Sequence, residues 1–277
     1  MAGAVFQSEG MTLTTVSEFA ASLAPKRPRL AGPTTFATVE DERLHRKQRL
    51  AAALRIFGKL GYSESLAGHI TARDPELTDH FWVNPLGRAF SRISVSDLIL
   101  VNHEGDVVYG DAPVNQAAFA IHSQIHAARP DVVSAAHSHS IHGKALSVLQ
   151  QELLPITQDS LAFFEDNVVV PDFNGVVLDI EEGRRIARHL GANRAALLAN
   201  HGLLTVGASV EEAVSLYVIA ERAAEVQLLA SAAGKVTFID ERVARHTHDQ
   251  SKRAGFGWAG FQNLWEEIVY EQPDLLD

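Results

Sequence analysis

In the stretch VSAAHSHSIH over residues 133–142, a run of small and apolar residues ends in two histidines, His137 and His139, at alternate positions. Alternate residues of a β-strand point to the same face of a sheet, so both imidazoles are expected to project together. Neutral imidazoles held side by side are typical ligands of a shared divalent cation. Two surface histidines at a frayed strand end are the alternative, and this spacing alone does not decide between them.

A third histidine, His201, has a similar setting. It follows the apolar strand AALLAN and precedes Gly202, so a second strand delivers an imidazole where the backbone turns. Two such strand ends, if they are neighbours in one sheet, place three imidazoles around one point. Three histidines with an open position are typical of a catalytic metal site, whereas structural zinc sites are closed and rich in cysteine. Chance clustering is the alternative.

The composition limits both the ligands and the partners. The 277 residues include no cysteine, so disulfides and thiolate sites are excluded and a metal must be held by His, Asp or Glu. The net charge is −10 and PKRPR at 25–29 is the one basic cluster, which argues against nucleic acid as a partner. No apolar run reaches the roughly 18 residues of a membrane span, and no signal-peptide pattern is visible. We expect a cytoplasmic protein with no membrane segment.

The elements that must position these histidines alternate between helix and strand, which predicts an α/β protein with helices covering a central sheet. Residues 1–38 predict a flexible N-terminal arm, and 39–277 predict the folded domain with a C-terminal helix. Helices are expected from Val39 to a stop at Gly61, over 115–129, over 181–190, from a Ser209–Glu212 capping box to about 233, and over 258–270. Strands are expected within SLAGHITARDP, HFWVNPLG, ISVSDLILVNHEGDVVYG, VVSAAHSH, QDSLAFFEDNVVVPDF and AALLANHGLLTVG.

Four separated motifs, AGHITARD, FWVNPLG, RPDVVSAAHSHS and LLANHGLLTVG, resemble the class II aldolase/adducin family. The similarity covers roughly residues 40–235. It implies a three-layer α/β/α sandwich with a central mixed sheet, usually assembled as a homotetramer. It also implies that His137, His139 and His201 are the metal ligands, which are the three histidines that the strand ends select.

The chain departs from the sugar-phosphate aldolases of that family at three motifs. Their Ser-Ser-Glu segment, whose serines help bind phosphate and whose glutamate is the acid/base, reads Gln116, Ala117 and Ala118 here. Their Thr-Pro-x-Gly turn begins with Asn84, and the Asn of their Gly-Asn motif is His69. Phosphate recognition needs several donors, so a sugar phosphate is disfavoured as substrate.

Candidate catalytic residues have to replace the missing carboxylate. His122 lies one helical turn beyond Ala118 on the same face, so we expect it to act as the base or to lean toward the metal. For His126, on the next turn, a helix position facing a polar neighbour is the preferred interpretation. Glu165 is either a site carboxylate or a solvated strand-end residue. The residues expected to contact substrate are His69, Asn84, Gly87, Arg88 and Gln158.

The predicted function is metal-dependent cleavage of a carbon–carbon bond. Three neutral imidazoles suit a chelating anion such as a 2-oxo acid, and on Fe(II) a remaining position is available to dioxygen. One branch of the family contains non-haem iron oxygenases/decarboxylases of aminocoumarin antibiotic biosynthesis, so oxidative decarboxylation of an aromatic 2-oxo acid such as a prenylated 4-hydroxyphenylpyruvate is favoured.

Two alternatives remain at this point. The first is a non-oxidative decarboxylase or aldolase that uses Mn(II) or Zn(II) and acts on a non-phosphorylated acid. The second is an adducin-like interaction module, which the three retained histidines disfavour. In the favoured case, the substrate ring is expected to lie against Phe163, Phe164 and the helix of Trp258 and Trp265.

Overall fold

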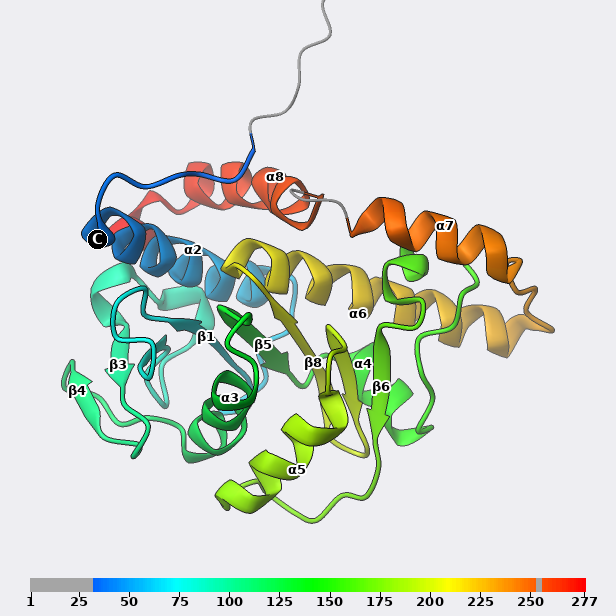
Figure 1. Cartoon of the computed structure of the whole chain (residues 1–277), viewed down its shortest axis with the longest axis horizontal. Coiled ribbons are helices and arrows are strands. Elements are labelled where there is room, and N and C mark those ends of the chain that lie inside the picture. Colours follow the sequence, from blue (N-terminus) through cyan, green and yellow to red (C-terminus); the bar gives the residue numbers. More distant parts are fainter. Residues whose placement is uncertain (1–31, 253–255) are drawn as a thin grey trace, which may run out of the picture. The chain divides into compact units, whose positions relative to one another are not determined.

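A computed structural model describes residues 32–252 and 256–277 of the chain (Figure 1). Most of the expected N-terminal arm, 1–38, lies outside these residues. Helix α2 begins at Val39, where Thr38 Oγ1 accepts a hydrogen bond from Asp41 N at 3.1 Å. Such an N-cap satisfies one of the free amide groups at a helix start. None of the helices in the described part is both long and apolar enough to cross a membrane.

One eight-stranded sheet forms the centre of the described chain, in the order β4-β3-β2-β1-β5-β8-β7-β6. Its neighbours pair antiparallel except β6 and β7, which run parallel, so the predicted mixed sheet is confirmed. The strands are β1 (His69–Arg73), β2 (Phe81–Val83), β3 (Ile99–Val101), β4 (Val107–Tyr109), β5 (Ser134–Ser138), β6 (Asn167–Val170), β7 (Ala195–Leu198) and β8 (Gly202–Gly207).

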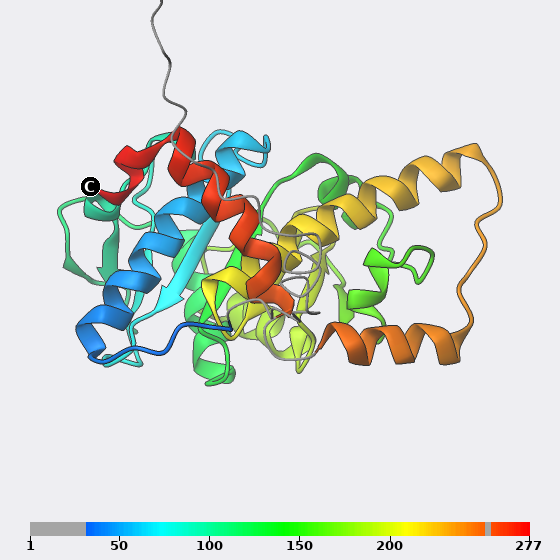
Figure 2. The ribbon, with the colours of Figure 1, turned by 90° about the horizontal axis from the view of Figure 1, so that it is seen from above.

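Helices cover both faces of this sheet, which confirms the three-layer sandwich (Figures 1 and 2). One face carries α2 (Val39–Lys59), α4 (Ile141–Val148) and α6 (Val210–Ala233), with α8 (Phe256–Glu271) packed on α2 and α6. The other face carries α3 (Gln116–Ala128) and α5 (Ile180–Leu190). Helix α7 (Glu241–Ser251) packs against the short 3₁₀ helix η3 (Asp159–Phe163). The other 3₁₀ helices are η1 (Phe90–Arg92), η2 (Val95–Asp97) and η4 (Pro273–Leu276).

The alternation of side chains along the strands divides the core into the two layers. Leu197 and Leu203 point into the larger cluster under α2 and α6, whereas Leu198 and Leu204 point into the cluster under α3 and α5. Strand β5 pairs with β8 so that His137 lies opposite Leu204. Directly paired residues point to the same face, so the His137 side chain lies on the α3 side of the sheet.

The sequence patterns find most of these elements, with two differences. The predicted capping box at the start of α6 is half formed: Ser209 Oγ accepts from Glu212 N at 3.1 Å, but the Glu212 carboxylate accepts from Ala208 N at 2.8 Å instead of from Ser209 N. Helix α7 was not predicted. Its charged sequence ERVARHTHDQS buries only Ala244 and His248, so it carries little of the apolar periodicity that reveals a helix.

Candidate metal centre

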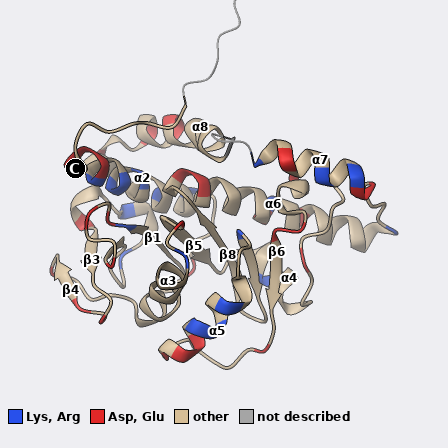
Figure 3. Cartoon of the chain, viewed as in Figure 1, with Lys and Arg blue, Asp and Glu red and all other residues tan. Residues whose placement is uncertain are grey.

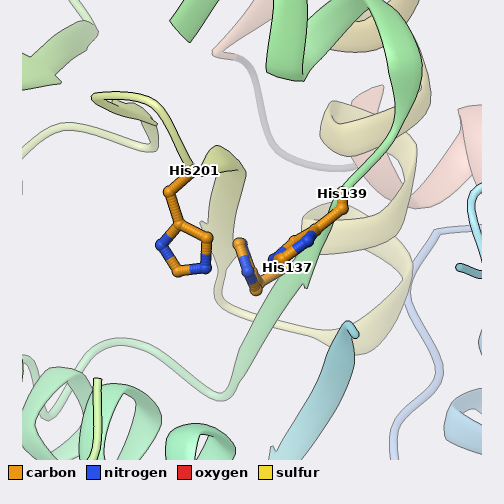
Figure 4. Close-up of side chains that lie close together, drawn as sticks. All are labelled: His137, His139 and His201. Atoms are coloured by element: carbon orange, nitrogen blue, oxygen red, sulfur yellow. The ribbon is translucent and has the colours of Figure 1, made fainter. Parts of the chain in front are cut away.

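The three histidines come together where β5 ends and β8 begins (Figure 4). His137 is in β5, His139 follows it, and His201 lies in the turn between β7 and β8. One ring nitrogen from each lies within 4.8 Å of the others, so one metal ion can contact all three imidazoles. The two strand ends predicted from sequence are therefore neighbours.

Two residues of the β7–β8 turn allow His201 to approach. Asn200 has a positive φ of 54°, a left-handed conformation that asparagine tolerates better than most residues. Gly202 passes so close to β5 that a Cβ atom there would lie 2.7 Å from Ser138 O and 3.3 Å from His137 Cε1. A side chain at position 202 would therefore force the two ligand-bearing segments apart.

The three imidazoles are neutral and prepared to bind a cation. Burial lowers the pKa of His201 to about 4 and holds the pKa values of His137 and His139 below the ordinary value, and the neighbouring imidazoles add to the effect at His137 and His201. His137 Nδ1 lies 2.8 Å from Leu203 O, so Nδ1–H donates to this carbonyl and Nε2 remains free. Such a hydrogen bond fixes the tautomer of a metal-ligating histidine. The donor set therefore fits a divalent cation.

The centre contains no carboxylate ligand within residues 32–252 and 256–277. Strands β5 and β8 carry no charged residue, and the charges gather on helices such as α5 and α7 (Figure 3). Glu64 and Lys144 are the charged groups that act on His139, and they form an ion pair with each other. Ala118, where the sugar-phosphate aldolases carry their acid/base glutamate, is fully buried.

Helix α6 holds the segment that carries the ligands. Tyr217 Oη lies 2.7 Å from Ser138 Oγ and 2.8 Å from Ser140 Oγ, on either side of His139. One turn later, buried Glu221 accepts from Ser140 Oγ at 2.5 Å and from Gly143 N at 2.8 Å. These side chains hold the segment from behind, and no local pattern indicates them because they lie some 80 residues away along the chain.

Two further predicted site histidines lie beside the metal ligands. His69 in β1 is paired directly with His137, and their ring centroids are 5.1 Å apart. His122 lies behind His69: its Nε2 is 3.1 Å from His69 Nδ1, and its Nδ1 is 2.9 Å from Thr71 Oγ1. Both ring nitrogens of His122 are thus occupied within the protein. His126, for which a polar neighbour was expected, contacts the same Thr71 oxygen at 2.9 Å.

The turn after β2 also lies at this end of the sheet. Val83 pairs with Thr71, so the following Asn84 lies beside Ile70, whose amide N is 3.4 Å from Asn84 Oδ1. Gly87 has a φ of 83° and borders an open hollow of about 770 Å³. Arg88 borders it as well, but its guanidinium pairs with Asp97 at 2.7 Å.

Glu165 and Gln158 are not brought to the centre within one chain. Strands β6 and β7 are parallel with Asn167 opposite Ala195, so Glu165 lies where these strands begin, whereas His201 lies beyond their other end. The Glu165 carboxylate pairs with Arg245 of α7, which lowers its pKa. Gln158 precedes η3 and borders a hollow lined by α7. Of the two interpretations of Glu165, the exposed pair with Arg245 agrees with a solvated strand-end residue. A contact of Gln158 with substrate stays a prediction.

The aromatic surroundings also differ from the prediction. Phe163 is fully buried in the larger core cluster, Phe164 lies under Arg245, and Trp265 of α8 lies under Arg49. Phe173, on the loop after β6, is half exposed and its ring centroid is 6.4 Å from that of His201. Its position three residues beyond the apolar run VVV was the signal that could have identified it.

Comparisons with known proteins agree with this geometry. The model of the "Class II Aldolase and Adducin N-terminal domain" matches residues 48–228. The chain is 44% identical over 245 residues to "Decarboxylase NovR" of Streptomyces niveus, covering 88% of this chain and 91% of that protein. It is also 44% identical to the "4-hydroxy-3-prenylphenylpyruvate oxygenase/4-hydroxy-3-prenylbenzoate synthase" of Streptomyces roseochromogenus subsp. oscitans, covering 88% of each.

A solved structure shows the same fold over most of the chain. The "L-fuculose 1-phosphate aldolase from Glaciozyma antarctica PI12" superposes with a TM-score of 0.83 at 44% identity, over 88% of this chain and 97% of that one. The family match covers the sheet from β1 to β8 and all three clustered histidines. The chain therefore belongs to the class II aldolase and adducin family.

Proposed function

We propose that this protein is an Fe(II)-dependent enzyme that oxidatively decarboxylates an aromatic 2-oxo acid of the 4-hydroxyphenylpyruvate type. The observation that carries the proposal is a centre of three neutral imidazoles with no carboxylate ligand in the described chain. The names of the two Streptomyces relatives, an oxygenase and a decarboxylase, support it. The working protein is expected to be a homotetramer, as is usual in the family.

The residues around the metal centre have separate proposed roles. His137, His139 and His201 hold the cation and contribute no charge, so a carboxylate and adjacent keto oxygen of the substrate are attracted to it. Bound Fe(II) would supply the activation of dioxygen. Phe173, half exposed beside His201, offers a surface for the substrate ring.

The proposed reaction has two steps, and atoms and electrons balance in each. The 2-oxo acid and one dioxygen give carbon dioxide and a 2-hydroxy acid that is one carbon shorter. That acid and a second dioxygen give carbon dioxide, water and the benzoate. No external 2-oxo acid is needed, since the substrate itself supplies the electrons in both steps.

A second candidate is aldol cleavage of a sugar phosphate, which the likeness to the L-fuculose 1-phosphate aldolase favours. Cleavage of that kind needs a group that takes a proton, and removing such a group costs roughly 10²–10⁴-fold in rate. Here the corresponding position is buried Ala118, with Ala117 and Gln116 before it. Non-oxidative decarboxylation with Mn(II) or Zn(II) needs no dioxygen and is the third outcome to test.

The test is an oxygen electrode with metal-free protein reloaded with Fe(II), Mn(II) or Zn(II). With 4-hydroxyphenylpyruvate and its 3-prenyl derivative, we expect equal amounts of dioxygen consumed and carbon dioxide released with Fe(II) alone. Carbon dioxide without oxygen uptake would support the non-oxidative reaction, and rapid cleavage of L-fuculose 1-phosphate would support the aldolase.

The metal ligands are tested separately by elemental analysis. Replacing His137, His139 or His201 by Ala is expected to abolish stoichiometric metal binding. His189→Ala on α5 is the matched control, because His189 is exposed and its Nδ1 lies 2.9 Å from the carbonyl oxygen of Arg185. A ligand variant that keeps full occupancy would remove that residue from the site.

A further inference from the structure

A file of four buried polar side chains leads away from the metal centre into the layer between the sheet and α3. His69 Nδ1 lies 3.1 Å from His122 Nε2, and His122 Nδ1 lies 2.9 Å from Thr71 Oγ1. The same Thr71 oxygen lies 2.9 Å from His126 Nε2, and His126 Nδ1 lies 3.4 Å from Val132 O. All four side chains are at most 3% exposed.

The three imidazoles of the file are buried, where a charged ring without a counter-ion is unfavourable, so we expect one proton on each ring. Burial lowers the pKa of His126 to about 3, assisted by the nearby Arg73 guanidinium. Burial and the neighbouring imidazoles hold the pKa of His122 well below the ordinary range. No carboxylate is hydrogen-bonded to any member of the file within the described residues. With one proton per ring and one on the hydroxyl, the direction of every hydrogen bond is linked to that of the next.

The backbone carbonyl at the far end sets this direction. Val132 O can only accept, so His126 Nδ1 carries the proton and His126 Nε2 must accept. Thr71 therefore donates its single hydroxyl proton to His126 and accepts from His122 Nδ1–H. His122 Nε2 is then an acceptor and receives Nδ1–H of His69.

The remaining nitrogen, His69 Nε2, is thereby left without a proton. His69 is paired with His137 in the sheet and points to the same face, so this nitrogen belongs to the metal-centre end of the file. No protein hydrogen bond to it is found in the described part of the chain. An unprotonated ring nitrogen that cannot change tautomer without reversing three other hydrogen bonds is a fixed acceptor.

We propose that His69 Nε2 accepts a hydrogen bond from an O–H group held at the metal centre, and that Thr71 and His126 are positioning residues that keep it an acceptor. The O–H group is either water on the cation or the enol hydroxyl of a bound 2-oxo acid. Only the second source rests on the proposed function.

The direct test is ¹⁵N NMR of the Zn(II)-loaded protein with ring-labelled histidines, assigned by single substitutions. We expect the Nδ1–H form for His69, His122 and His126. An Nε2–H form at His69 or His122 would overturn the proposal. This NMR measurement involves no turnover, so its result does not depend on whether the protein catalyses the oxygenase reaction.

Thr71→Val removes the hydroxyl but keeps the shape of the side chain. We expect the ring signals of His122 and His69 to show mixed tautomers in this variant, and Thr71→Ser to restore a single form. Ser134→Ala is the matched control, since buried Ser134 Oγ on the adjacent strand has no hydrogen-bond partner in the described structure. A single Nδ1–H form retained in Thr71→Val would remove Thr71 and His126 from this role.

The two sources of the O–H group give different results. A shift of the His69 Nε2 resonance on adding Zn(II) alone indicates water on the cation, and a shift only after adding 4-hydroxyphenylpyruvate indicates the enol. With the Fe(II) enzyme, Thr71→Val is expected to lower kcat/KM by about tenfold, the effect of one lost hydrogen bond. No change of the resonance with either addition would contradict the proposal.

Discussion

Replacing Glu221 tests how helix α6 holds the segment that carries the metal ligands. The Glu221 carboxylate is 3% exposed and accepts from Ser140 Oγ at 2.5 Å, from the amides of His142 and Gly143 at 2.9 and 2.8 Å, and from His142 Nδ1 at 3.1 Å. It thus satisfies the free amides at the start of α4, where a negative charge is favoured by the helix dipole.

The expected loss is large because Glu221→Ala leaves several buried donors without an acceptor. Removing one partner of a buried charged network costs about 3–5 kcal/mol. In a domain of this size such a loss lowers the Tm by about 10 °C. Glu221→Gln keeps the shape and one acceptor oxygen but turns an NH₂ group toward amide donors, so we expect about half that loss. Glu225→Gln, one turn later in an exposed pair with Arg222, is the control and should cost under about 1 kcal/mol.

The assay combines thermal unfolding with titration of the cation. Both Glu221 variants should bind Zn(II) more weakly as well as melt earlier, since α4 begins directly after His139. The expected weakening is about 10–100-fold, typical of losing an outer hydrogen bond at a metal site. If Glu221→Ala melts like Glu225→Gln, the network does not hold this segment. If it melts early but binds Zn(II) with unchanged affinity, the network supports α4 without orienting the ligands.

Three further predictions concern acid stability, packing and a buried ion pair. Burial lowers the pKa of His126 to about 3, so only the unfolded chain takes up its proton. The stability it contributes is present above pH 6.5, and about 1.4 kcal/mol should be lost between pH 7.5 and 5.5, measured by denaturant unfolding. A flat profile there would contradict neutral burial. Gly202→Ala should abolish tight Zn(II) binding, because its new methyl group would collide with β5. Gly234→Ala is the control, since a methyl group there meets open space. Equal Zn(II) affinities of the two variants would refute the close contact at Gly202. Burial alone would raise the pKa of Asp74, but hydrogen bonds from Arg43 and other donors lower it to about 2. Asp74 therefore contributes about 2 kcal/mol to folding stability above pH 3.8, and this contribution is lost as the pH falls toward 2. Asp74→Asn should remove that part of the acid unfolding transition.

The cluster of three histidines could be predicted from sequence because its signals are local. A run of small apolar residues that ends in His-x-His indicates a strand and its end, and the alternation of the strand places His137 and His139 together. Neither strand sequence alone shows that β5 and β8 are neighbours. That expectation came from the resemblance of four motifs to a known family. The pairing of His137 with Leu204 is the long-range contact that brings the two predicted strand ends together.

The surroundings of the other candidate residues depend on contacts that no local pattern specifies. Glu165 and Gln158 precede β6, and only the parallel pairing with β7 shows that they lie at the far end of the sheet. His122 lies on the predicted helical face, but its two ring nitrogens are hydrogen-bonded to His69 and Thr71. The sequence around Thr71 does not indicate that this strand residue contacts a histidine. Helical spacing gives the direction of a side chain, and its partners depend on the neighbouring strand.

The neutrality of the three ligands links the binding of the metal to the binding of the acid. Because His137, His139 and His201 bring no negative charge, a cation held by them keeps its full charge until an anion arrives. An anionic substrate then gains affinity from the cation. By thermodynamic reciprocity, the cation must be held more tightly by the same factor when the acid is present. Starved of substrate, the protein should therefore release its metal more readily, and the supply of the acid would regulate how much of the protein is loaded.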